Sequence, residues 1–188
     1  MTFWTSVYSE PKRTHRFLLR MPNLIDSSEE HQYQDYLAKT CTKPAYSITS
    51  TEHKFLGNTY YYPGTVTWNE VVVSIVNSLL PDGNKILYDA LELSGYLRPD
   101  QQLADLREGA VGTVNKASAL GALGQVQIDE LTGTGDTAGR WTLQNAFITE
   151  AKFGDLDYNS DELLNIDITF KYDWATYEAF TVITDTSS

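Results

Sequence analysis

The sequence contains a single cysteine, Cys41, among its 188 residues. One cysteine cannot form a disulfide within the chain, and it cannot supply the several thiolates of a structural zinc site. It also lacks a nearby histidine and an active-site motif, so a catalytic thiol is not expected. We therefore predict that Cys41 is a buried or inert thiol in a reducing compartment.

Long apolar runs are also missing. No stretch approaches the roughly 20 apolar residues that span a bilayer. The opening "MTFWTSVYSEPKRTHR" lacks the apolar segment of a signal peptide. The sequence thus predicts a soluble intracellular product. With 41% apolar and 12% aromatic residues, the chain can still fill the core of one domain, which its length suits.

Positive charge is scarce, because 14 lysines and arginines stand against 25 aspartates and glutamates and the formal net charge is −11. A protein that binds nucleic acid regardless of sequence needs cations that displace counterions from phosphates, so that class is not expected. The charge is uneven along the chain. Residues 1–20 carry four lysines and arginines against Glu10, a balance of +3, and residues 149–178 carry eight acids against two lysines, a balance of −6. These segments are either ordinary solvated faces or opposite surfaces that meet between copies.

Motifs for catalysis or cofactor binding do not occur in the sequence. His15, His31 and His53 lie far apart and show no metal-ligand spacing. The glycines of "GTGD" and "GALG" are not followed by the Lys-Ser/Thr pair of a phosphate-binding loop. We therefore expect no catalytic, cofactor-binding or metal site, and we do not expect an enzyme.

The acidic run "FGDLDYNSDE", residues 153–162, is the one stretch that suggests a cation site. Its acidic and amide side chains alternate over Asp155–Asp161, like the oxygen ligands of a calcium loop. An EF-hand loop also needs glycine at its sixth position and glutamate at its twelfth, where this sequence has Ser160 and Ile166. The preferred interpretation is a polar turn between strands, in which Asn and Asp side chains accept hydrogen bonds from backbone amides. Cation binding is the alternative.

Two-residue alternation predicts several strands. Residues 162–174 are the clearest case, because five apolar side chains alternate with polar ones and give one dry and one wet face: Leu164, Ile166, Ile168, Phe170 and Tyr172. Residues 15–21 show the same period. Residues 68–77 are rich in β-branched side chains, and both faces of that strand are expected to be covered.

Two further strands are predicted towards the C-terminus. Residues 124–131 place Val126 and Ile128 inward, and residues 140–153 form the next strand, with Trp141 and Leu143 in phase and an irregularity near Asn145. The composition of residues 132–140 predicts a turn between them.

A helix and a hairpin arm complete the predicted elements. Residues 81–97 show a helical apolar stripe that starts near Asp82 and stops at Gly95, whereas residues 98–124 have weak patterning and are expected to be loop with possible helical turns. Residues 45–68 combine β-prone residues with turn formers, which predicts a hairpin arm. The predicted fold class is mainly β: an antiparallel β-barrel or sandwich with one flanking α-helix and an extended hairpin arm.

Two long stretches carry a resemblance to a known family. These are "FLGNTYYYPGTVTWNEVVVSIVN" and, after the helix, "VQIDELTGTGDTAGRWTLQNAFITEAKFGDLDYNSDELLNIDITFKYDW". Together they resemble the tail tube protein family of contractile-tailed bacteriophages, either its major tube subunit or a tube-initiating or tube-terminating relative. The resemblance covers about Arg13 to Glu178. It implies a single domain over residues 1–188, with residues 1–12 as an N-terminal extension and residues 179–188 as a C-terminal tail.

The resemblance also implies an assembly. Members of the family form rings of six copies, which stack into a hollow tube beneath a contractile sheath. Strands of all subunits line the lumen, and a protruding hairpin, here within Thr49–Trp68, reaches neighbouring copies. The implied partners are further copies of the chain, the tail sheath protein, and the baseplate and tail terminator proteins. Genomic DNA passes through the lumen without specific binding. The implied location is the virion tail, assembled in the host cytoplasm.

Seven residues are the candidates for contacts between subunits: Arg13, Arg16, Tyr60, Tyr61, Tyr62, Asp155 and Asp157. Arginines near one end of the chain and aspartates near the other could pair between stacked rings, and heterologous contacts of that kind generate open-ended stacks. Two alternatives stay open: a tube protein of a bacterial injection apparatus that carries effectors, and a monomeric β-sandwich module that binds a ligand through the hairpin tyrosines.

Overall fold

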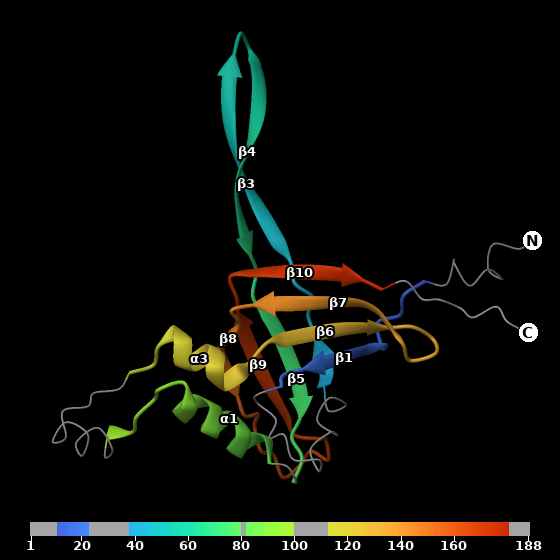
Figure 1. Ribbon diagram of the computed structural model, residues 1–188, viewed down its shortest axis with the longest axis vertical. Coiled ribbons are helices and arrows are strands. Elements are labelled where there is room, and N and C mark those ends of the chain that lie inside the picture. The colour runs from blue at the N-terminus through green and yellow to red at the C-terminus, as the bar shows by residue number, and fades with distance from the viewer. Residues whose placement is uncertain (1–10, 23–37, 80–81, 100–112, 181–188) are drawn as a thin grey trace, which may run out of the picture.

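The computed structural model describes residues 11–22, 38–79, 82–99 and 113–180. Two four-stranded antiparallel sheets and a separate hairpin contain all of the named strands in these ranges (Figure 1). Sheet A has the order β1 (Phe17–Arg20), β6 (Val126–Leu131), β7 (Thr137–Gln144), β10 (Trp174–Ala179). Sheet B has the order β2 (Ala38–Cys41), β5 (Val71–Val76), β9 (Asn165–Lys171), β8 (Phe147–Lys152). The hairpin consists of β3 (Tyr46–Phe55) and β4 (Asn58–Trp68).

The core lies between the two sheets. Sheet A contributes Leu19, Val126, Ile128 and Leu143, and sheet B contributes Val71, Val73, Ile166, Ile168 and Phe170. The sheets do not close on each other through hydrogen-bonded strands, so the architecture is a sandwich and not a barrel. The predicted mainly β fold class is confirmed.

Strand β9 shows how directly the alternation specifies this core. Ile166, Ile168 and Phe170 are 0% exposed, while the intervening Asp167 and the following Lys171 are exposed. Each buried side chain of this size contributes about 1.5 to 3 kcal/mol relative to an exposed one. The strand is therefore explained by packing alone.

Two helices flank the sandwich on the same side, next to β8 (Figure 1). The predicted helix is confirmed as α1 (Gly83–Leu93), capped by the Asp82 carboxylate, which accepts a hydrogen bond from the amide of Asn84. A second helix, α3 (Lys116–Leu123), lies in the stretch that was expected to be loop with possible helical turns. This helix has only eight residues, so its sequence shows little helical periodicity of apolar side chains. The Asn115 cap and the burial of Leu123 stabilise it. No helix in the described ranges has both the length and the apolar character that crossing a membrane requires.

Several smaller expectations can be compared with the structure. The irregularity near Asn145 is confirmed, since this residue has φ of 56°, but the single strand predicted over residues 140–153 is wrong: the chain crosses at Asn145 from β7 in sheet A to β8 in sheet B. The turn after β6 is shorter than predicted, because β7 already begins at Thr137. The expectation that both faces of residues 68–77 are covered is wrong, since Val72 is 41% exposed while Val71 and Val73 on the opposite face are fully buried.

The hairpin arm, residues 46–68, stands away from the sandwich at one end of the long axis of the molecule (Figure 1). Strands of 10 and 11 residues, at about 3.4 Å per residue, give it a length of about 35 Å. It begins at Tyr46, which agrees with the arm predicted over residues 45–68 and is earlier than the Thr49 start that the resemblance implied. The arm leads directly into β5, whose first residue, Val71, pairs with Phe170. The acidic loop, residues 153–164, precedes the opposite end of β9, so arm and loop lie at opposite ends of sheet B.

Candidate assembly surfaces

The hairpin arm exposes its side chains without exception from Tyr46 to Thr67. Tyr60, Tyr61 and Tyr62 are 48%, 69% and 57% exposed, and Phe55 at the tip is 58% exposed. A two-stranded ribbon of this kind is marginal in water on its own. Exposed contiguous apolar surface on a soluble subunit usually marks an interaction site. The arm is therefore the first candidate for a contact with another molecule.

The three candidate tyrosines do not share one face of the arm. Directly paired residues lie on the same side of an antiparallel ribbon. Tyr60 pairs with His53 and Tyr62 with Thr51, whereas Tyr61 pairs with Glu52. The arm thus has a paired-tyrosine face (Thr51, His53, Phe55, Tyr60, Tyr62) and a single-tyrosine face (Ser50, Glu52, Lys54, Tyr61, Pro63). The three tyrosines predicted as one group of contact residues therefore lie on two different faces.

A β-bulge near the base of the arm determines which β3 residues share a face with each tyrosine. The register shifts between Ile48 and Ser50, where β4 has one residue more than β3. Thr49 Oγ1 accepts a hydrogen bond from the amide of Thr65 at 3.0 Å. A Cβ atom on Gly64 would lie 2.4 Å from Thr49 Oγ1, so glycine is required for this close approach. Below the bulge, Trp68 joins the arm to the body, with its ring centroid 5.4 Å from that of Tyr46 and 6.0 Å from that of Tyr172.

The acidic loop is a polar turn, as predicted. Asp157 Oδ1 accepts from the amide of Asn159 at 2.9 Å, and Ser160 Oγ accepts from the amide of Glu162 at 3.3 Å. Asp155 and Asp157 are both exposed. The loop also exposes apolar side chains, since Leu156 is 90% exposed and Tyr158 is fully exposed. Across the described residues, no three His, Cys, Asp or Glu side chains come together as a metal site requires.

The basic segment, residues 12–20, contains cations that are paired within the subunit. Lys12 donates hydrogen bonds to the Glu130 carboxylate and, at 2.8 Å, to the hydroxyl of Tyr177. Arg20 forms an ion pair with Asp129 at 3.2 Å. These two cations stabilise the subunit itself, so the surface charge of this segment is smaller than the sequence balance of +3 indicated. Arg13 is exposed and Arg16 is half-buried.

A pocket of about 210 Å³ lies beside this segment, lined by Lys12, Arg13, Arg16, Lys43 and Glu130, among others. Glu130 is 7% exposed and also forms an ion pair with Lys43. Burial disfavours the carboxylate, but the hydrogen bonds from Lys12 and Lys43 outweigh it and hold the pKa of Glu130 below its ordinary value. Two lysines thus pair with one ionised carboxylate, and two arginines line the same pocket.

Cys41 also lines this pocket, and it is half-buried. Burial raises the pKa of its thiol to about 12. At neutral pH the group is therefore a thiol and not a nucleophilic thiolate, which agrees with the predicted inert cysteine.

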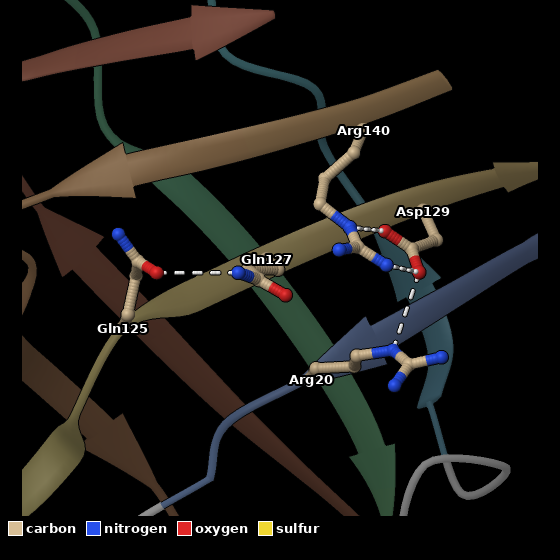
Figure 2. A network of polar contacts seen from close by, with 5 residues as sticks. All are labelled: Arg20, Gln125, Gln127, Asp129 and Arg140. Carbon is tan, nitrogen blue, oxygen red and sulfur yellow. Dashed lines mark hydrogen bonds and ion pairs between the residues drawn. The ribbon is translucent and has the colours of Figure 1, made fainter. Parts of the chain in front are cut away.

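A buried ion cluster on sheet A was not predicted from the sequence. The carboxylate of Asp129 is 0% exposed and receives two hydrogen bonds from Arg140, at 2.6 Å from Nε and 2.8 Å from Nη2 (Figure 2). Arg20 approaches the same carboxylate from β1, and Gln127 bonds Gln125 beside the cluster (Figure 2). The two hydrogen bonds from Arg140 join β7 to β6 in their observed register, and the Arg20 ion pair joins β1 to β6. Residue spacing could have suggested the cluster only if the strand pairing had been known.

The candidate residues therefore lie in three separate places on one subunit. The tyrosines are on the arm, the two arginines are at the basic pocket beside β1, and the two aspartates are on the acidic loop at the far end of sheet B. The structure brings none of these groups together within a single copy. Contacts among them would have to form between copies.

No protein-family model and no curated protein matches the chain. Solved structures do match. A chain of the anti-feeding prophage baseplate aligns with a TM-score of 0.61 at 17% identity, covering 91% of this chain and 97% of that one. A chain of the anti-feeding prophage tube-terminating cap aligns with a TM-score of 0.62 at 16% identity, covering 91% and 93%.

A third match comes from the sheath/tube terminator of an extracellular contractile injection system in its extended state. It has a TM-score of 0.58 at 15% identity and covers 90% of this chain and 98% of that one. These identities are too low to carry function, but the overlap spans nearly the whole of each chain. The chain therefore has the fold found in these contractile assemblies, in agreement with the tail tube resemblance.

Proposed function

We propose that this protein is a self-assembling structural subunit of the tube of a contractile injection apparatus. The observation that carries the proposal is the arm: some 20 exposed residues, rich in aromatic side chains, project from an otherwise packed sandwich. A monomer gains nothing from such a projection, whereas a neighbouring copy would bury it. The fold shared with baseplate, cap and terminator chains of contractile systems supports the same function.

The specific form of the proposal is the one that the sequence resemblance implies. Six copies form a ring, rings stack into a hollow tube inside a sheath, and the tube ends at baseplate and terminator proteins. In a phage tail, which is part of the virion and is assembled in the host cytoplasm, the cargo is genomic DNA. A net charge of −11 suits a DNA conduit, because carboxylates on the wall repel phosphates over about 8 to 10 Å at cellular salt. A tube that carries effector proteins is the second form, and the neighbouring genes distinguish the two.

Negative-stain electron microscopy of the purified protein tests the proposal. We expect hollow rods or rings with six-fold symmetry at micromolar concentration. A protein that remains a compact monomer at high concentration would contradict the tube function and favour a monomeric binding module. Analytical ultracentrifugation of the same samples provides the mass of the assembled species.

Charge reversal tests the contacts between stacked rings. Arg13→Glu combined with Arg16→Glu is expected to weaken stacking by about tenfold or more, because it places carboxylates opposite the acidic loop of the next copy. The concentration needed for rod formation measures the effect. Adding Asp155→Arg and Asp157→Arg to the same chain should restore stacking, because the pairs are re-formed with opposite polarity.

The control is Lys39→Glu, compared with Arg13→Glu alone, since it makes the same change in charge at an exposed position elsewhere. Normal rods from the Arg13/Arg16 variant would show that stacking does not use these residues. Circular dichroism of the variant monitors the fold, because Lys12 and Arg20, which hold internal ion pairs, are left unchanged.

A further inference from the structure

An apolar groove runs between the two helices and β8. It has a volume of about 420 Å³. Leu87 and Leu91 of α1, Ala119 of α3, Ile148 and Ala151 of β8, and Phe153 are among its lining residues. Leu91 and Phe153 are 43% and 44% exposed, so apolar surface is open to solvent along it.

One edge of this groove is an unpaired strand edge. Strand β8 is the last strand of sheet B and pairs only with β9 among the described residues. An edge of this kind beside an apolar groove can receive an extended ribbon, with side chains in the groove and the backbone along the strand. Glu150 is the one charged side chain among the described lining residues.

The paired-tyrosine face of the arm has the complementary chemistry. Phe55, Tyr60 and Tyr62 supply exposed aromatic surface, and His53 and the two phenol hydroxyls supply hydrogen-bond donors for a carboxylate such as Glu150. The opposite face carries Glu52, whose carboxylate would lie against Glu150. Chemistry therefore favours one face of the arm over the other as the partner of the groove.

The arm cannot enter the groove of its own subunit. It projects from one end of the molecule, whereas α1 and α3, which line the groove, lie to the side of the sandwich, away from the arm (Figure 1). A ribbon of about 35 Å that leaves the body can instead reach the groove of another copy. Donor and acceptor are then different surfaces of one chain, and such contacts propagate into rings or open stacks.

We propose that the arm of one subunit inserts its paired-tyrosine face into the groove between α1, α3 and β8 of a second copy. This inference rests on the proposed tube function and identifies the surface that receives the arm. Tyr60 and Tyr62 fill the groove, Tyr61 faces away from it, and Glu150 accepts a hydrogen bond at its rim.

Cysteine cross-linking between separately purified proteins tests the contact. Both proteins carry Cys41→Ser. One carries Tyr62→Cys on the arm and the other carries Leu91→Cys in the groove. After mixing and mild oxidation, we expect a disulfide-linked dimer whose linked peptides are identified by mass spectrometry. Tyr61→Cys, one residue away on the opposite face, is the matched control and should cross-link at least about tenfold less.

The result also separates this proposal from the tube function. If rods form but Tyr62→Cys does not cross-link to Leu91→Cys, the groove contact is wrong and the tube function still stands. The same conclusion follows if Tyr61→Cys cross-links as efficiently as Tyr62→Cys. Absence of both rods and linkage would overturn both. If Leu91→Cys resists a small thiol reagent in non-assembled protein, residues of the same chain cover the groove and the proposal is wrong.

Substitution without cysteine gives an independent measurement. Tyr60→Ser with Tyr62→Ser is expected to raise the concentration needed for assembly by about 30-fold or more, as loss of aromatic anchors in a buried pocket does. Tyr61→Ser should change it by about twofold at most. Equal effects of the two variants would contradict the assignment of faces.

Discussion

Arg140→Met is expected to lower the free energy of unfolding by about 3 to 5 kcal/mol, because it leaves the Asp129 carboxylate buried without its main partner. That carboxylate is 0% exposed, and both of its oxygens accept hydrogen bonds from Arg140. Methionine keeps most of the apolar stem that covers the strand, so the loss is that of the charge and not of the packing. For a domain of this size the corresponding fall in melting temperature is roughly 6 to 20 °C.

Urea unfolding followed by circular dichroism, below the concentration of assembly, measures this change. Two controls define its origin. Arg20→Met should cost about 1 kcal/mol or less, since the Arg20 side chain is 45% exposed and makes a single contact at 3.2 Å. Asp129→Leu combined with Arg140→Met removes the buried charge and should recover much of the loss. A cost below about 1 kcal/mol for Arg140→Met alone would mean that water reaches Asp129.

The sequence predicts the sandwich well where burial alone determines the structure. The alternation of Ile166, Ile168 and Phe170 is uninterrupted, and a strand with that pattern can only place one face in a core. The helix α1 was predictable for a similar reason, because a capping Asp82 precedes a continuous apolar stripe. In both cases the information is local, and no knowledge of the strand pairing is needed.

The features that were missed depend on contacts distant in the sequence. Asp129 and Arg140 form a pair only because β6 and β7 place them in direct register, and Arg20 comes from a strand more than 100 residues away. The composition of each face of the arm depends on a single bulge opposite Thr49, which determines the β3 residues that share a face with each tyrosine. An alternation count along β4 alone cannot locate that bulge. Candidate surfaces could therefore be named from the sequence, but their geometry could not.

Removing the arm is expected to abolish assembly while leaving the subunit folded. The variant replaces residues 49–65 with Asn-Gly, so that the pair formed by Ile48 and Val66 is closed by a tight hairpin turn. The deleted segment contains no buried side chain. The removal should therefore change the melting temperature by only about 2 °C. The retained Trp68 still packs against Tyr172 and completes the edge of the core.

The loss of assembly should be large in comparison, with the concentration needed for rods or rings raised by about 100-fold or more. Thermal unfolding by circular dichroism and negative-stain microscopy of the same preparation measure the two quantities together. A fall in melting temperature above about 10 °C would show that the arm stabilises its own subunit. Rods of normal length without the arm would show that the sandwich alone carries the contacts between copies. The Arg140→Met variant is expected to lower the melting temperature of the subunit, whereas removal of the arm is expected to prevent assembly. Comparing the two variants therefore separates the contacts that stabilise one subunit from those that join it to the next.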